Sequence, residues 1–151
     1  MTLYRKARIE DVEPIYQLVM GHAQGGTMLP RSRQSLYEGI REYVVAEEQN
    51  EIIAVGALRI LWSDLAEIRS LVVRDGRTRQ GIGQRIVELL EEEAKALGLP
   101  QVFALTYQET FFMRCGYEKI SNKALPQKVW RDCIDCPKFP DCEEVAVLKR
   151  L

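Results

Sequence analysis

An apolar run, a glycine-rich turn and a long amphipathic stretch follow one another in the middle of the chain. Residues 66–73 read A-E-I-R-S-L-V-V, residues 77–84 read R-T-R-Q-G-I-G-Q, and apolar side chains recur at helical spacing through 81–97. This order predicts a strand, a tight turn and a helix. A helix N-terminus exposes unpaired N–H groups, and glycine lets an anion approach the backbone. The turn is therefore a candidate phosphate site.

The local pattern leaves a second interpretation open, in which the glycines only relieve strain between the strand and the helix. On the first interpretation, Arg77 and Arg79 would add charge-assisted contacts to a diphosphate. The turn is not a P-loop, because no lysine followed by Ser or Thr comes after the last glycine. It also lacks the G-x-G-x-x-G spacing of a dinucleotide fingerprint.

The whole pattern predicts one α/β domain over residues 1–151, with a mixed α+β order of elements, because this length is that of one ordinary domain. The order β-α-α-β-β-β-α-β-α-β-β favours a central sheet that is antiparallel at first and then has crossover helices. Strands are predicted at 3–7, 43–47, 52–62, 66–73, 102–106, from 117 and at 145–148. Helices are predicted at 11–20, 32–43, 81–97 and 110–114.

Helix details follow from the same pattern. Asp11 and Ser32 are candidate N-caps, since their side chains can accept from backbone N–H groups. In helix 81–97 one face is expected to be buried and the other to meet water. The expected buried residues are Ile82, Ile86, Leu89, Leu90 and Leu97, and the expected exposed residues are Glu88, Glu91, Glu92 and Lys95.

Composition argues against several classes of partner. A net charge of −1 gives no overall attraction to nucleic acid or to an anionic membrane. The longest apolar runs are too short to span a bilayer, and the N-terminus lacks the apolar core of a signal peptide. We therefore expect a cytoplasmic protein that acts on neither nucleic acid nor membrane.

Three cysteines lie in an insertion at about 127–143. Cys133, Cys136 and Cys142 form C-x2-C-x5-C, which could bind zinc with Cys115 or a carboxylate as the fourth ligand. A closed structural site usually has a second spaced pair, which this segment lacks, so redox-active or packed thiols remain the alternative. The prediction is no metal. Without a secretion signal, thiols or metal ligands are favoured over disulfides.

Strand, turn and acidic helix together resemble the acetyl-CoA motif of the GNAT N-acetyltransferases. The family pattern Q/R-x-x-G-x-G/A falls on Thr78, Gly81 and Gly83, with Thr78 departing from the usual Gln or Arg. The resemblance implies the GNAT-like acyl-CoA N-acyltransferase fold, a central mixed sheet flanked by helices, with acetyl-CoA as acetyl donor. It implies donor contacts at Leu71, Val72, Val73, Arg79, Gln80, Gly81, Ile82, Gly83 and Gln84.

Longer stretches are similar to the stand-alone bacterial N-acetylglutamate synthases. They are L-W-S-D-L-A-E-I-R-S-L-V-V, T-F-F-M-R-C-G-Y and M-L-P-R-S-R-Q-S-L. The resemblance implies acetylation of the α-amine of L-glutamate, the first step of arginine biosynthesis, and it allows a homodimer. Asp64 stands near the place where the long synthases have a lysine, which keeps L-glutamine open as the acceptor.

Two other readings of function remain. A GNAT fold can act on another small amine or on a protein N-terminus. A chain with the same binding loop can also be a non-catalytic acyl-CoA-binding or metal-responsive regulator.

The resemblance assigns Glu67 as general base and the backbone of Leu71 as the group that stabilises the thioester oxyanion, at a bulge in this strand. Strand alternation would put Glu67, Arg69 and Leu71 on one face and Ile68, Ser70 and Val72 on the other. Arg69 could then pair with Glu67 and weaken it as a base. The alternative for Glu67 is a glutamate that faces solvent.

A dicarboxylate acceptor requires convergent arginines, because a guanidinium binds a carboxylate with two parallel hydrogen bonds. Arg31, Ser32, Arg69 and Thr106 are the predicted acceptor contacts, and Arg33 is a weaker candidate. Each arginine could equally be a solvated surface residue. The family's thiolate-protonating tyrosine falls on Phe112, which has no hydroxyl, so Tyr107 or no dedicated acid remains.

Overall fold

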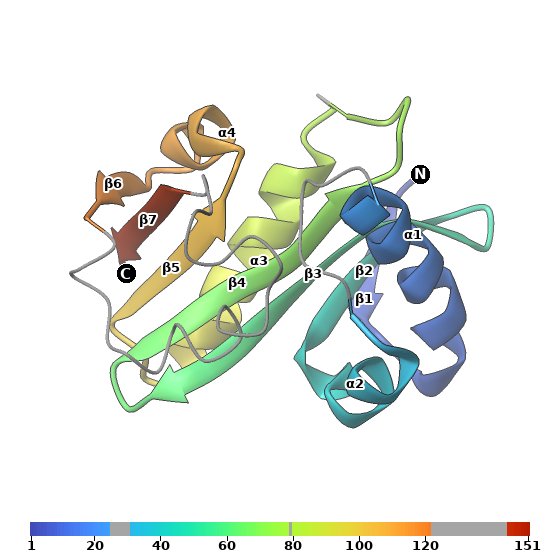
Figure 1. Ribbon diagram of the computed structural model, residues 1–151, viewed down its shortest axis with the longest axis horizontal. Helices are drawn as coiled ribbons and strands as arrows, with labels where there is room; N and C mark the ends of the chain where they lie inside the picture. Colours follow the sequence, from blue (N-terminus) through green and yellow to red (C-terminus); the bar gives the residue numbers. More distant parts are fainter. Residues whose placement is uncertain (25–30, 79, 122–144) are drawn as a thin grey trace.

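The computed structural model describes residues 1–24, 31–78, 80–121 and 145–151. Within these ranges the strands form one seven-stranded sheet in the order β1-β2-β3-β4-β5-β7-β6 (Figure 1). The strands are β1 Leu3–Lys6, β2 Tyr43–Glu48, β3 Glu51–Trp62, β4 Leu65–Val73, β5 Gln101–Thr106, β6 Glu118–Ile120 and β7 Val145–Arg150. The helices are α1 Val12–Gln24, α2 Arg33–Glu38, α3 Ile82–Ala96 and α4 Glu109–Arg114, with short 3-10 helices at Ile9–Asp11 and Ile40–Glu42.

The sheet is mixed, as predicted. Strands β1 to β4 pair with antiparallel neighbours, β4 pairs with β5 in parallel, and β5 and β6 both pair antiparallel to β7. A parallel pair needs a crossover connection, and α3 supplies it between β4 and β5. No helix in the described part of the chain is both long and apolar enough to cross a bilayer.

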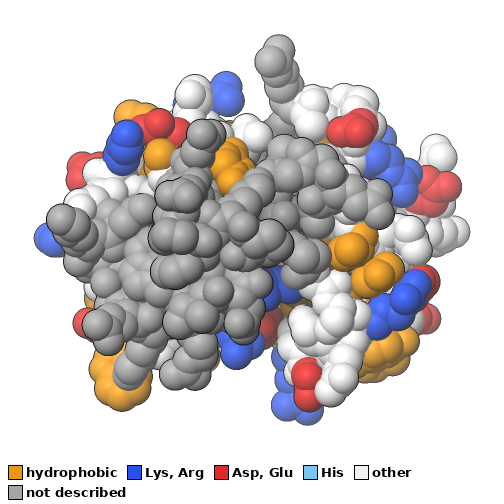
Figure 2. Space-filling model, in the orientation of Figure 1, with side chains coloured by type: hydrophobic (Ala, Val, Ile, Leu, Met, Phe, Trp, Pro, Cys, Tyr) orange, Lys and Arg blue, Asp and Glu red, His pale blue; other side chains and the backbone are white. Residues whose placement is uncertain are grey.

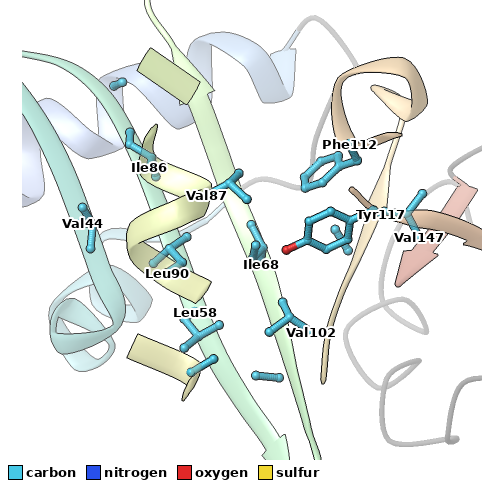
Figure 3. Packing of buried hydrophobic residues seen from close by; sticks show 14 of the residues in the cluster. Val44, Leu58, Ile68, Ile86, Val87, Leu90, Val102, Phe112, Tyr117 and Val147 are labelled. Carbon is cyan, nitrogen blue, oxygen red and sulfur yellow. The ribbon is translucent and has the colours of Figure 1, made fainter. Parts of the chain in front are cut away.

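Apolar clusters of the described residues cover both faces of the sheet. On one face, Ile86 and Leu90 of α3 are fully buried against residues such as Leu58 and Ile68, as Figure 3 shows. On the other face, Val12, Ile15 and Val19 of α1 and Leu36 of α2 pack on β2 to β4. Each such side chain contributes about 1.5–3 kcal/mol by leaving water. The helices therefore pack on both faces of the sheet around β4, and the candidate site lies on this strand.

Helix ends differ from the prediction in two places. Asp11 closes a 3-10 turn instead of capping α1, and its carboxylate accepts from the Arg8 N–H at 2.7 Å and from Arg5 at 2.7 and 2.9 Å. Ser32 is the N-cap of α2, as predicted, and accepts from the Ser35 N–H at 3.1 Å. That helix ends at Glu38, five residues before the predicted end at 43, because Gly39 interrupts it.

Helix α3 departs from its predicted faces at two residues. Leu97 is 56% exposed, because it is the C-cap and the chain turns away at Gly98, whose φ is +85°. Glu91 is buried, not exposed, because its carboxylate accepts from the Tyr117 hydroxyl at 2.9 Å and from Lys149 Nζ at 3.1 Å. The burial of Glu91 thus depends on Lys149 of β7 and on Tyr117, just before β6, and helical spacing does not reveal these partners.

Gly56 in β3 has no room for a side chain. A Cβ there would lie 2.6 Å from Ile86 Cγ2. We expect Gly56→Ala to lower the free energy of unfolding by about 1–3 kcal/mol, the usual cost of overpacking a core. Gly21, in α1, has no described neighbour within 4 Å of its added Cβ, so Gly21→Ala should raise stability by about 0.5–1 kcal/mol. Urea unfolding measures the free energy of unfolding of both variants. Equal changes in Gly56→Ala and Gly21→Ala would contradict the packing described around Gly56.

Candidate active site

A bulge interrupts β4 beside Gly56. Val55 pairs with Val72 and Ala57 pairs with Arg69, so Ser70 and Leu71 both stand opposite one residue of β3. Ser70 has a φ of 57°, in the left-handed region that L-residues rarely adopt. The expected bulge is therefore present, and a glycine inside the partner strand is the sequence signal that could have located it.

This bulge overturns the predicted faces of β4. Leu71 and Val73 pack with the α3 core, while Val72 packs with the core under α1 and α2. Placing Leu71 on the same face as Glu67 and Arg69 was wrong, because the extra residue at Ser70 shifts the alternation by one.

Strands β4 and β5 separate just before this bulge. Their ladder joins Ala66 to Val102 and Glu67 to Phe103, and no further pair follows among the described residues. Figure 1 shows the two strands diverging from there, with α3 behind them. From Ile68 onward the edge of β4 is therefore not paired with β5, and an extended ligand could add there as a strand does.

The N-terminus of α3 follows the end of β4. Gly81 is its N-cap with a φ of 80°, and no atom of the described residues lies within 4 Å of where its Cβ would be. The first turn, which is fully described, has no acidic residue to offset the helix dipole. The Cβ of Gly83, by contrast, would lie 3.3 Å from the Phe111 ring. The first glycine therefore keeps the helix start open, and the second lets α4 approach.

The remaining predicted donor contacts surround this turn. Ile82 is buried, and Gln80 and Gln84 are exposed. Arg77 donates to Glu48 at 2.7 Å and to Gln80 Oε1 at 3.1 Å. That guanidinium, with the Thr2 hydroxyl, lowers the pKa of Glu48 to about 2. Arg77 thus joins β2 to Gln80, the residue just before the N-cap of α3.

Glu67 and Arg69 pair with each other, as the sequence allowed. Arg69 donates to the same oxygen, Glu67 Oε1, from Nη2 at 2.5 Å and from Nε at 3.1 Å. Both side chains are only 11% exposed. Residues directly opposite in a sheet share a face, and Ala57, opposite Arg69, belongs to the core under α1 and α2. The pair therefore lies on the sheet face away from α3.

The predicted acceptor residues near α2 differ in their environments. Ser32 caps α2, and Arg31 just before it is half-buried. Arg33 donates to Glu13 at 2.8 and 2.9 Å and lies 4.0 Å from the Tyr16 ring centre, so it clamps α2 to α1. Figure 2 shows basic and acidic side chains beside α2 on this face. Helices α1 and α2 cover the face that carries Glu67 and Arg69.

The fourth acceptor candidate is at the end of β5. Thr106 is buried, and its Oγ1 accepts from the Gln108 N–H at 2.7 Å. This hydrogen bond shapes the turn into α4. Tyr107, the half-buried candidate acid, comes next in the chain.

Neither Phe112 nor Tyr117 offers a hydroxyl for the thiolate. Phe112 is buried with its ring edge-on to Tyr117 at 5.2 Å. The Tyr117 hydroxyl donates to Glu91, and burial, then the Glu91 charge, raises its pKa far above the ordinary value. Tyr117 is therefore a core residue. Arg79, Cys133, Cys136 and Cys142, with the insertion at 127–143, lie outside the described residues.

Sequence comparison places these features in a known family. The acetyltransferase (GNAT) family model matches residues 9–117. A protein from Chlorobaculum tepidum, named an uncharacterized N-acetyltransferase, is 40% identical over 150 residues, 99% of this chain and 97% of that protein. An amino-acid acetyltransferase from Mycobacterium tuberculosis (strain ATCC 25618 / H37Rv) is 40% identical over 129 residues, 83% of this chain and 74% of that protein.

Solved structures agree with the fold. A Mycobacterium tuberculosis protein in complex with CoA and NLQ has a TM-score of 0.83 at 34% identity, with 99% of each chain covered. N-acetylglutamate synthase from Neisseria gonorrhoeae, complexed with coenzyme A and N-acetyl-glutamate, has a TM-score of 0.91 at 24% identity, over 100% of this chain and 35% of that one. The second likeness shows the fold alone. This chain belongs to the acetyltransferase (GNAT) family.

Proposed function

We propose that this chain transfers the acetyl group of acetyl-CoA to the α-amine of an amino acid, with L-glutamate as acceptor and L-glutamine as the second candidate. One observation carries the proposal. Among the described residues, the edge of β4 that β5 leaves unpaired runs from a buried carboxylate–guanidinium pair to the start of a helix whose first turn has no acidic residue. In acetyl-CoA the diphosphate would lie at the helix start, and the thioester would lie near the buried Glu67–Arg69 pair.

The donor lies along β4 in this proposal. The diphosphate accepts from N–H groups at the start of α3, where Gly81 leaves the approach open. The pantetheine arm runs beside Leu71, Val72 and Val73 in the place of a strand. The residues fit this ligand because the bulge and the separation of β4 from β5 leave that edge without a neighbouring strand among the described residues.

Glu67 and the backbone of β4 carry the chemistry. The amino group must lose a proton before it attacks, and Glu67 takes that proton directly or through a water. The nitrogen then bonds to the thioester carbon, and the Leu71 N–H stabilises the oxyanion. Collapse breaks the C–S bond, and the second amine proton ends on the thiolate. The products are the N-acetyl amino acid, CoA thiol and one proton released to solvent.

The acceptor is held by arginine in this proposal. Arg69 lies beside Glu67, and Arg31 precedes the helix that covers the same face. Relatives named amino-acid acetyltransferase support an amino acid as acceptor. The sequence resemblance to the N-acetylglutamate synthases is the ground for proposing glutamate and with it the first step of arginine biosynthesis. Asp64, near the position of a lysine in the long synthases, is the reason to test glutamine beside it.

A thiol-release assay over the free amino acids tests the proposal. We expect CoA release to depend on glutamate or glutamine, and mass spectrometry to find the acetyl group on the α-nitrogen. Acetyl-CoA without an acceptor is the control for hydrolysis. Release with polyamines or peptides but with no free amino acid would contradict the assignment. Binding of acetyl-CoA without release for any amine would favour the regulator.

A further inference from the structure

The Glu67–Arg69 pair has the charges of an α-amino acid in reverse. The two residues are two positions apart on one strand, so their backbones lie about 7 Å apart on the same face. A zwitterionic acceptor carries its ammonium and carboxylate on one carbon. A carboxylate on Arg69 and an ammonium on Glu67 would therefore replace one internal ion pair by two with the ligand.

The two described hydrogen bonds of the internal pair share a single carboxylate oxygen. Both hydrogen bonds end on Glu67 Oε1, so the pair is not the parallel arrangement in which each nitrogen meets its own oxygen. It also lies where β4 leaves β5, since Glu67 is the last residue in their ladder. The opposing residue on β3, Arg59, is directed to Glu42 at 3.4 Å. Of these two arginines, Arg69 is the one that donates to Glu67.

We propose that the acceptor's α-carboxylate displaces Glu67 from Arg69, and that this exchange makes Glu67 available as the base. The inference rests on the proposed function and adds a selection step to it. When an amine without a carboxylate binds, Arg69 stays hydrogen-bonded to Glu67. The carboxylate of Glu67 is then less able to take the proton of that amine. Arg69 then acts as a positioning residue as well as a carboxylate contact, and it selects amino acids through kcat as well as through KM.

The α-amide of the active amino acid is the diagnostic substrate. It keeps the amine and nearly the same size but lacks the negative charge. With the natural chain we expect its kcat to fall by about tenfold or more, part of the 10²–10⁴-fold that a general base provides. A carboxylate that only contributes to binding would raise KM and leave kcat unchanged, and that result would overturn the exchange.

Arg69→Gln gives the sharper test, because it removes the cation that holds Glu67. We expect this variant to lose amino-acid turnover and yet to acetylate the α-amide faster than the natural chain does. A purely structural role predicts that both substrates become slower, and a purely binding role predicts no change for the α-amide. Either of those outcomes overturns the exchange.

Two further measurements keep the test decisive. Thermal unfolding and acetyl-CoA titration show whether Arg69→Gln is folded. If it is not, the nearly isosteric Glu67→Gln replaces it, and the N-acetylated product should bind this variant more tightly than the natural chain with CoA present. Unchanged or weaker binding would overturn the proposal. Absence of turnover with every free amino acid defeats the proposed function itself, whereas amino-acid turnover without these effects defeats only the exchange.

Discussion

Glu67→Gln lowers kcat for amino-acid acetylation by about 10²–10⁴-fold, the usual contribution of a general base. Glutamine has nearly the same shape and still offers an oxygen to Arg69, but it cannot take the proton of the acceptor's ammonium. The KM for acetyl-CoA should stay the same, because the turn proposed to bind the donor lies at the other end of β4. Steady-state thiol release at saturating acceptor measures both constants.

The matched control is Glu118→Gln, which changes an exposed glutamate on β6. It should leave both constants unchanged. Full activity of Glu67→Gln would remove Glu67 from the chemistry and return it to a structural partner of Arg69.

Gly81→Val raises the KM for acetyl-CoA by about 100-fold or more, as expected if roughly 3 kcal/mol of diphosphate binding is lost. Valine is strained at a φ of 80°, and its side chain enters the space above the start of α3. Titration of acetyl-CoA into the purified variant, beside its kinetics, measures the effect.

Gly76→Val separates strain from the loss of the anion site. Gly76 has a φ of 87° and an equally open Cβ position, but it lies in the turn before the helix rather than at its N-cap. Both variants should lose similar stability, and only Gly81→Val should lose donor affinity. If both lose affinity equally, strain in the loop explains the result and the anion site does not.

Periodicity and turn chemistry were enough to predict the layered fold. The strand, glycine turn and helix at 66–97 occur as β4 and α3, within one or two residues of their predicted ends. The glycine after Leu97 and the serine before α2 were informative because caps are local, and each is decided by a few neighbouring residues.

The errors came from partners distant in sequence. Leu71 changed face because β4 bulges opposite Gly56, and Glu91 is buried because Lys149 and Tyr117 reach it. Neither the bulge in β4 nor the distant partners of Glu91 leave a trace in the periodic spacing of apolar residues. For the candidate site, the sequence named Glu67 and Arg69 and allowed their pairing, but it gave no means of deciding between that pairing and a glutamate that faces solvent.

The central claim is that acetyl-CoA lies along the edge of β4 from which β5 diverges and presents its thioester on the face of Glu67. A crystal structure of the chain with CoA and the N-acetylated amino acid tests this most directly. The account predicts the diphosphate at the N–H groups beside Gly81, the sulfur between β4 and β5, and the acetyl group near Leu71 and Glu67. A diphosphate bound elsewhere, with the edge of β4 from Ile68 to Val73 covered by the protein's own side chains, would contradict it.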